Sequence, residues 1–124
     1  MRPDVELRLP VDSAYVSVLR ATTVSLAARL DFTIDDIEDL RMAVGEACAM
    51  VLPCADVGSE LTCGYFMGPG RLTITVSVPS KDPELPDREG FAWQMLNALT
   101  TDAATTADQG ELTVTMTMNS TATV

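Results

Sequence analysis

Histidine is absent from this chain of 124 residues, and its absence removes several kinds of chemistry at once. A Ser-His-Asp or Cys-His centre needs an imidazole to accept a proton, so neither kind of hydrolase site is available. Zinc sites also draw on histidine, and three scattered cysteines without a Cys-x-x-Cys pair do not replace it. The sequence therefore excludes most hydrolase chemistry and predicts no metal site.

Cysteine is scarce, and long apolar runs are missing. An odd set of three, Cys48, Cys54 and Cys63, argues against a disulfide framework, because the N-terminal stretch MRPDVELRLPVDS has no apolar signal core. We expect the three cysteines to be core or near-core thiols. We also expect a cytoplasmic protein without a membrane partner, since no run of 18 apolar residues could form a transmembrane helix.

Basic residues are few, with Lys plus Arg at 8 against Asp plus Glu at 18, which gives a net charge of −10. This charge repels a phosphate backbone, so we expect no direct nucleic-acid partner. The negative charge is explained first by solubility, and second by a basic protein partner. A chain of this length with 47% apolar residues is predicted to be a single domain, residues 1–124.

Apolar periodicity predicts a strand over residues 5–10, where apolar and polar side chains alternate. Asp12 or Ser13 can cap the helix that follows. The buried stripe predicted for this helix is Tyr15, Leu19, Thr22, Leu26 and Leu30. Arg20 lies off that stripe, on the side of Val16 and Thr23.

A second helix begins with a capping box, in which Thr33 is followed three residues later by Asp36. Its predicted core stripe is Ile37, Leu40, Val44, Ala47 or Cys48, and Val51. Pro53 ends it.

The second half of the chain predicts a hairpin over residues 60–78, a loop over 79–90, a helix over 91–99 and a last strand over 110–118. The inward residues expected in the helix are Phe91, Met95 and Leu99, and Trp93 is expected to be partly buried packing. The order β-α-α-β-β-α-β indicates an α/β two-layer sandwich, with a mixed antiparallel sheet of about four to five strands and three helices on one face. We expect the tail after residue 118 to be frayed.

The second helix carries one carboxylate, Glu46, between Met42 and Met50. The three residues are four apart, so they form one stripe along the helix. Either Glu46 is an ordinary solvated residue, or this stripe lines a site whose chemistry has changed.

Two motifs carry a resemblance to a known family. DLRMAVGEACAMVL is similar to the N-box helix of the GHKL (histidine-kinase-type) ATPase fold, and REGFAWQMLNALTTD is similar to that family's glycine turn and following helix. Within the fold, the chain most resembles the anti-sigma factors that double as switch-protein serine kinases, in particular their actinobacterial stress-response branch. The resemblance runs over nearly the whole chain and implies the two-layer fold.

The resemblance places Glu46 where the family has its catalytic general base, which would deprotonate a serine on an antagonist protein. Met50 falls where the family has the asparagine that holds Mg²⁺, and a thioether is a poor ligand for that ion. ATP and Mg²⁺ are therefore possible by family, but we expect no cofactor.

The remaining nucleotide motifs depart from the family in the same direction. Asp82 is the nearest carboxylate to the position of the adenine-binding Asp, but the family's Asp-x-Gly motif is absent. In the Gly-x-Gly turn Gly90 is kept, but Ala92 replaces the second glycine. Gly110 is kept, but Glu111 places a negative charge beside it. The degenerate nucleotide pocket implied by the resemblance is Met42, Met50, Asp82, Gly90 and Gly110.

The resemblance also implies partners. An arginine in the first helix contacts the sigma factor and the antagonist in this family, so the surface around Val16, Arg20 and Thr23 is the expected contact. The expected function is an anti-sigma factor that sequesters an alternative sigma factor, countered by a STAS-domain anti-anti-sigma protein, with a homodimer as the working form. The alternatives are an active ATP-dependent serine kinase acting on the STAS antagonist, and an adaptor that binds STAS proteins alone.

Overall fold

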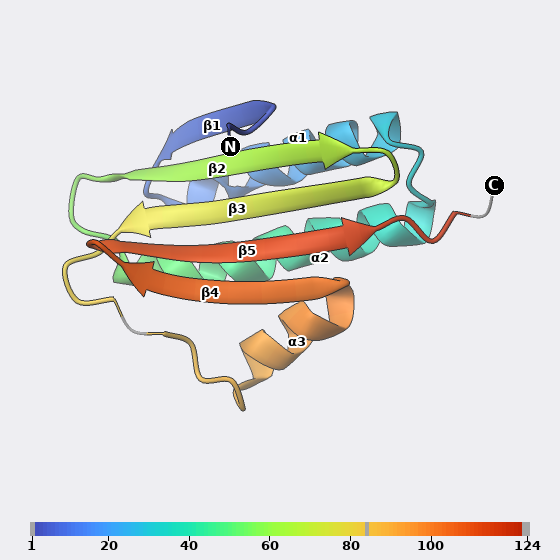
Figure 1. The fold of residues 1–124 in the computed structure, drawn as a ribbon. Coiled ribbons are helices and arrows are strands. Elements are labelled where there is room, and N and C mark those ends of the chain that lie inside the picture. The colour runs from blue at the N-terminus through green and yellow to red at the C-terminus, as the bar shows by residue number, and fades with distance from the viewer. Residues whose placement is uncertain (1, 84, 123–124) are drawn as a thin grey trace.

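The computed structural model describes residues 2–83 and 85–122, and across these residues it contains a sheet of five strands with three α-helices on one face (Figure 1). The strands lie in the order β1-β2-β3-β5-β4, and all the pairings between neighbours are antiparallel. The expected two-layer sandwich is therefore confirmed. Within the described residues, no helix combines the length and the apolar character needed to cross a membrane.

The elements follow the predicted order except for one strand. The strands are β1 Val5–Pro10, β2 Glu60–Gly68, β3 Arg71–Pro79, β4 Asp102–Asp108 and β5 Glu111–Asn119. The α-helices are α1 Val16–Arg29, α2 Ile34–Val51 and α3 Phe91–Leu99, with short 3₁₀ turns at Ser13–Tyr15 and Leu52–Cys54.

The strand missing from the prediction is β4, which forms an edge of the sheet and pairs only with β5. Its core-facing residues are Ala103, Thr105 and Ala107, which oppose the buried Met116, Val114 and Leu112 of β5. Alanine and threonine give almost no apolar alternation, so the sequence pattern did not reveal a strand.

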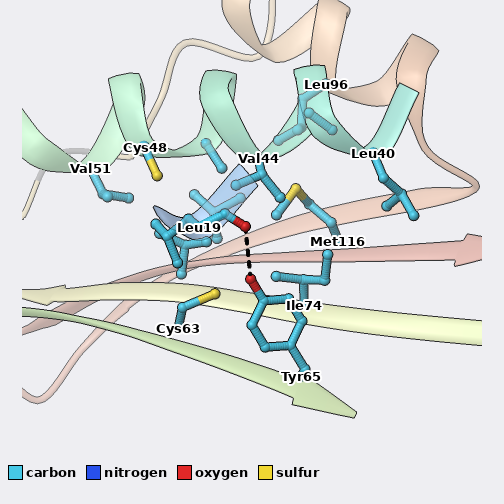
Figure 2. Close-up of a cluster of buried hydrophobic side chains, with 14 of the residues drawn as sticks. Leu19, Leu40, Val44, Cys48, Val51, Cys63, Tyr65, Ile74, Leu96 and Met116 are labelled. Atoms are coloured by element: carbon cyan, nitrogen blue, oxygen red, sulfur yellow. Dashed lines mark hydrogen bonds between the residues drawn. The ribbon is translucent and has the colours of Figure 1, made fainter. Parts of the chain in front are cut away.

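Helix α2 is the best predicted element. The side chain of Thr33 accepts a hydrogen bond from the Asp36 N–H at 3.1 Å, which is the N-cap contact that the capping box predicts. The buried residues of the stripe are Leu40, Val44, Ala47, Cys48 and Val51, as expected, while Ile37 is partly buried. These side chains meet β2, β3 and β5 in the core shown in Figure 2.

Helix α1 is rotated relative to the prediction. Its buried residues are Val16, Leu19, Thr23 and Ala27, whereas Tyr15 is exposed and Thr22 is only partly buried. The expected stripe was right at Leu19, and Leu26 and Leu30 pack partly against the core, but it was wrong at Tyr15. Both sides of this helix carry small or apolar residues, so periodicity did not distinguish them. A polar contact decides between the two sides.

That contact joins Thr23 to Tyr65, whose ring lies fully buried on β2 (Figure 2). The two hydroxyl oxygens are 2.9 Å apart. The Thr23 hydroxyl donates its one proton to the Leu19 carbonyl at 2.7 Å, so it accepts the proton of the Tyr65 hydroxyl, which also lies 3.3 Å from that carbonyl oxygen. Because a buried hydroxyl without a partner is unfavourable, this bond favours the rotation that brings Thr23 over β2.

The end of the chain is tied down by a second polar contact. The Asp36 carboxylate, 4% exposed, accepts hydrogen bonds from the Thr121 N–H at 2.8 Å and from the Thr121 hydroxyl at 2.9 Å. Burial raises the pKa of this carboxyl, but hydrogen bonds from Thr121 and Thr33 outweigh burial and hold the pKa below its ordinary value. The tail was expected to be frayed, and that expectation was wrong for residues 119–121, because Asn119 lies in β5 and Ser120 bonds to Gly70, while residues 123 and 124 lie outside the described residues.

We expect Tyr65→Phe and Thr23→Val each to lower the free energy of unfolding by about 1 kcal/mol, since each removes the buried hydrogen bond between the two hydroxyls. The double variant should lose less than the sum, because both substitutions remove the same bond. Urea denaturation measures all three. Tyr15→Phe is the matched control at an exposed tyrosine of the 3₁₀ turn before α1, and it should change little. Strictly additive losses would show that the two hydroxyls do not interact.

We expect Asp36→Asn to destabilise the protein at pH 7 by about 1–2 kcal/mol, since it weakens hydrogen bonds made to a charged acceptor. The pKa of Asp36 is lower in the folded state, so its stabilising contribution is complete above the unfolded value of about 3.9 and is lost as pH falls through the folded value. Urea midpoints between pH 7 and pH 3 should therefore converge for the two proteins. Asp35→Asn, at the exposed neighbour, is the charge-matched control. A gap that stays constant with pH would contradict this account.

Candidate functional site

Met42, Glu46 and Met50 lie on the flank of α2 that is turned away from α1. Gly45 faces α1, because the guanidinium of Arg20 lies against it. Each following residue of a helix is rotated by about 100°, so Glu46 lies about 100° and Met50 about 140° around the helix from Gly45, turned away from α1. Helix α3 packs on that side of α2 (Figure 1). The predicted stripe therefore exists, with Met42 44% exposed and the other two side chains partly buried.

The loop between β3 and α3 is held at its start by hydrogen bonds to other segments. The Ser80 N–H donates to the Gly110 carbonyl at 2.8 Å, and the Lys81 N–H donates to the Asp56 carboxylate at 3.0 Å. Asp82 follows as an exposed side chain. These contacts join the start of the loop to the β4–β5 turn and to residue 56, and not to α2.

The end of the loop is closed by Asp87. Its carbonyl accepts the Gly90 N–H at 2.9 Å, and its carboxylate accepts the Glu89 N–H at 3.0 Å. A Cβ added to Gly90 would lie 3.0 Å from the same Asp87 carbonyl oxygen, so the tight turn by itself accounts for this glycine. The backbone donor that a phosphate would need at Gly90 is already used, and a carboxylate stands beside it.

Gly110 also has a local explanation. It lies in the β4–β5 turn with φ of 74°, a left-handed conformation that favours glycine. Its neighbour Glu111 is exposed. The structure thus accounts for both retained glycines of the predicted pocket, Gly90 and Gly110, without a nucleotide.

The donor set does not fit Mg²⁺. The position expected to hold the ion offers the thioether of Met50, whereas Mg²⁺ prefers hard oxygen ligands in an octahedral shell. Among the described residues, no three His, Cys, Asp or Glu side chains are grouped so that they could hold a metal ion. Two surface hollows, of about 310 and 240 Å³, lie at the β4–β5 turn and beside the end of β5, and neither is lined by the α2 stripe. At the position of Met50 the chain therefore offers no oxygen ligand that suits Mg²⁺.

The expected partner surface needs a correction. Arg20 is exposed, but Val16 and Thr23 are buried and cannot belong to an exposed contact surface. The reason is the rotation of α1, which turns both residues toward the sheet. Two large apolar side chains, Tyr15 just before α1 and Val18 within it, are exposed instead.

Helix α3 also differs from the prediction. Phe91 is 78% exposed, whereas Trp93 and Leu96 are buried and Met95 and Leu99 are partly buried. Phe91 begins the helix and is held away from the core, while the guanidinium of Arg88 lies over the Trp93 ring at 5.6 Å from its centroid. A helix of nine residues is too short for its apolar periodicity to show whether Phe91 or Trp93 faces the core.

The cysteines behave as core thiols at two positions. Cys48 and Cys63 are buried between α2 and β2, and Cys54 is partly buried (Figure 2). Burial raises the pKa of the Cys48 thiol to about 11 and that of Cys63 to about 12. Both thiols are therefore protonated and unreactive near neutral pH.

Comparison with known proteins identifies relatives for part of the chain. No family model matches it. The chain is 37% identical over 76 residues to the serine-protein kinase RsbW of Bacillus cereus (strain ATCC 10987 / NRS 248), which covers 59% of this chain and 47% of the relative. It is 38% identical over 74 residues to the RsbW of Halalkalibacterium halodurans, covering 59% and 46%. The chain thus spans about half the length of the curated relatives that it matches.

A solved structure extends the likeness to the whole fold. The crystal structure of the RsbU and RsbW domains of Rv1364c from Mycobacterium tuberculosis matches 95% of this chain and 33% of that one, with a TM-score of 0.67 and 19% identity. At that identity the match shows the fold alone. The chain is therefore similar in sequence to serine-protein kinases named RsbW over 59% of its length, and similar in fold to the solved structure over 95% of its length.

Proposed function

We propose that this protein is an anti-sigma factor, which sequesters an alternative sigma factor and is countered by a STAS-domain anti-anti-sigma protein. The relationship to the RsbW kinases supports this proposal, and so does the two-layer fold that carries the N-box-like helix α2. The exposed Arg20 on α1 provides a charged contact for either protein partner.

The observation that carries the proposal concerns the two positions where the resemblance places phosphate and Mg²⁺, Gly90 and Met50. The Gly90 N–H is bonded to Asp87, and Met50 stands where an oxygen ligand is needed. Sequestration requires only a binding surface, whereas phosphoryl transfer requires a metal and a phosphate cradle as well. The proposal is therefore binding with weak or no use of ATP.

The alternative is an active serine kinase that phosphorylates the STAS antagonist. It is favoured by the sequence similarity to serine-protein kinases and by Glu46, the carboxylate of α2 at the position of the family's general base. Glu46 would then accept the proton of the attacking serine hydroxyl. An adaptor that binds STAS proteins and no sigma factor is a third form of the same scaffold.

The proposal treats residues 1–124 as one domain that works in the cytoplasm as a homodimer. The mass of the purified protein in solution tests the dimer. Within the family, we propose that the protein belongs to the actinobacterial stress-response branch.

We expect calorimetric titration with ATP, with and without Mg²⁺, to show no magnesium-dependent binding, and we expect no transfer of γ-phosphate to a STAS protein of the same genome. Met50→Asn is the matched variant, because it restores the oxygen ligand at one position. Magnesium-dependent transfer by the unaltered protein, abolished by Glu46→Gln, would establish the kinase instead.

We expect the protein to co-purify with a sigma factor of the same genome, and Arg20→Glu to weaken that complex by about thirtyfold or more, since a reversed charge at an interface costs about 2–5 kcal/mol. Arg29→Glu is the control, because it makes the same charge change at the far end of α1. If Arg20→Glu leaves the complex as tight as Arg29→Glu does, Arg20 is not in the contact.

A further inference from the structure

The guanidinium of Arg20 lies against the backbone of α2 at Gly45. A Cβ at Gly45 would stand 2.5 Å from Nη2, 3.1 Å from Nε and 3.2 Å from Cζ of Arg20. These three atoms belong to the planar head of the arginine, so its charged end rests over the second helix. Any larger residue at position 45 would displace it.

Glycine at this position has no conformational explanation. Gly58, Gly70 and Gly110 adopt positive φ values, whereas Gly45 lies inside α2 with ordinary helical geometry. Glycine is the least favourable residue in a helix interior after proline. What Gly45 provides is therefore space, and the side chain that fills that space is Arg20.

The surroundings of Arg20 leave its charge available. Among the described residues, ion pairs join Arg8 to Glu6 and Arg41 to Glu38, and neither includes Arg20. Residues 13–30 contain two arginines and no acidic residue, in a chain with net charge −10. The outward side of α1 therefore attracts an anionic group locally, although the protein as a whole repels one.

The electrostatics of Cys48 agree with this placement. Cys48 follows Gly45 by three residues on the α1-facing side of α2. Burial raises the pKa of its thiol to about 11, and the positive charge of Arg20 works against that rise. The positive charge of Arg20 therefore lies close enough to act on a buried thiol of α2. Helices α1 and α2 lie side by side in Figure 1.

We propose that Gly45 is a positioning residue, which lets Arg20 lie over α2 so that the partner surface is formed by both helices and binds a carboxylate-bearing segment of the sigma factor. A guanidinium held flat presents its fork of N–H donors in one direction, and that fork matches a carboxylate. The proposal rests on the function proposed above, and it adds a residue that never touches the partner.

The packing is tested first without any partner, by urea denaturation of Gly45→Ala alone and in an Arg20→Ala background. Alanine favours the helix over glycine, so the substitution should raise the denaturation midpoint in the Arg20→Ala protein. In the protein that keeps Arg20, the rise should be smaller, because the new methyl group displaces the guanidinium. Equal rises in the two backgrounds would show that Arg20 does not rest on Gly45.

Ala49→Gly is the matched control for this cycle. Ala49 is exposed on α2, four residues after Gly45. The exchange involves the same two residue types, and its effect on the midpoint should be the same with and without Arg20. A dependence on Arg20 at position 49 as well would mean that Arg20 acts on the whole helix and not on Gly45.

The binding role is tested with the sigma factor that co-purifies with the protein. Gly45→Ala should weaken the complex about tenfold, the size of one charge-assisted hydrogen bond, while the folded protein loses no stability. In the Arg20→Ala background the same substitution should not weaken it further. Arg20→Lys should not restore tight binding, because an ammonium group keeps the charge without the planar fork.

The outcomes separate the two proposals. If the unaltered protein binds the sigma factor and Gly45→Ala binds equally well, the positioning role is wrong and the anti-sigma function stands. If the unaltered protein binds no sigma factor, the proposed function fails, and the role of Gly45 in binding fails with it. Additive effects of Gly45→Ala and Arg20→Ala on binding would also overturn the positioning role.

Discussion

The buried hydroxyl of Tyr65 favours the rotation of α1 that the structure shows. It is buried on β2 and bonds to Thr23, so α1 must turn Thr23 toward the sheet. That rotation buries Val16 beside it and leaves Tyr15 and Val18 exposed. It also directs Arg20 toward α2, where Gly45 leaves room for its guanidinium. One buried hydrogen bond therefore connects the core of the protein to the composition of its exposed surface.

Sequence patterns predicted the elements whose apolar periodicity is strong. Helix α2 has a capping box and a clear stripe, and β3 and β5 alternate regularly between buried and partly exposed residues. Strand β4 was missed because alanine and threonine fill its core-facing positions. The stripe of α1 was misplaced because its decisive residue is Thr23, a polar side chain whose partner lies 42 positions away in the chain. No local pattern contains that information.

In the candidate site, too, the sequence shows which residues are present but not which contacts they make. The sequence revealed that Gly90 and Gly110 are present and that Met50 replaces an expected oxygen ligand. It could not reveal that the Gly90 N–H is occupied by Asp87, or that Gly110 is required by a turn with positive φ. A glycine that matches a nucleotide-binding motif can therefore be explained by its own loop, and the hydrogen-bond pattern distinguishes that case from a phosphate cradle.

The contact between Asp36 and Thr121 joins residues that are 85 positions apart. During synthesis on a ribosome the first turn of α2 emerges long before its last partner, by about 4–17 s at 5–20 residues per second. Strand β5 must also pair with β3 before Thr121 can reach Asp36. The N-terminus of the helix that carries Glu46 is thus completed only after residue 121 has been synthesised, so a chain interrupted before that residue retains the whole of α2 without this contact.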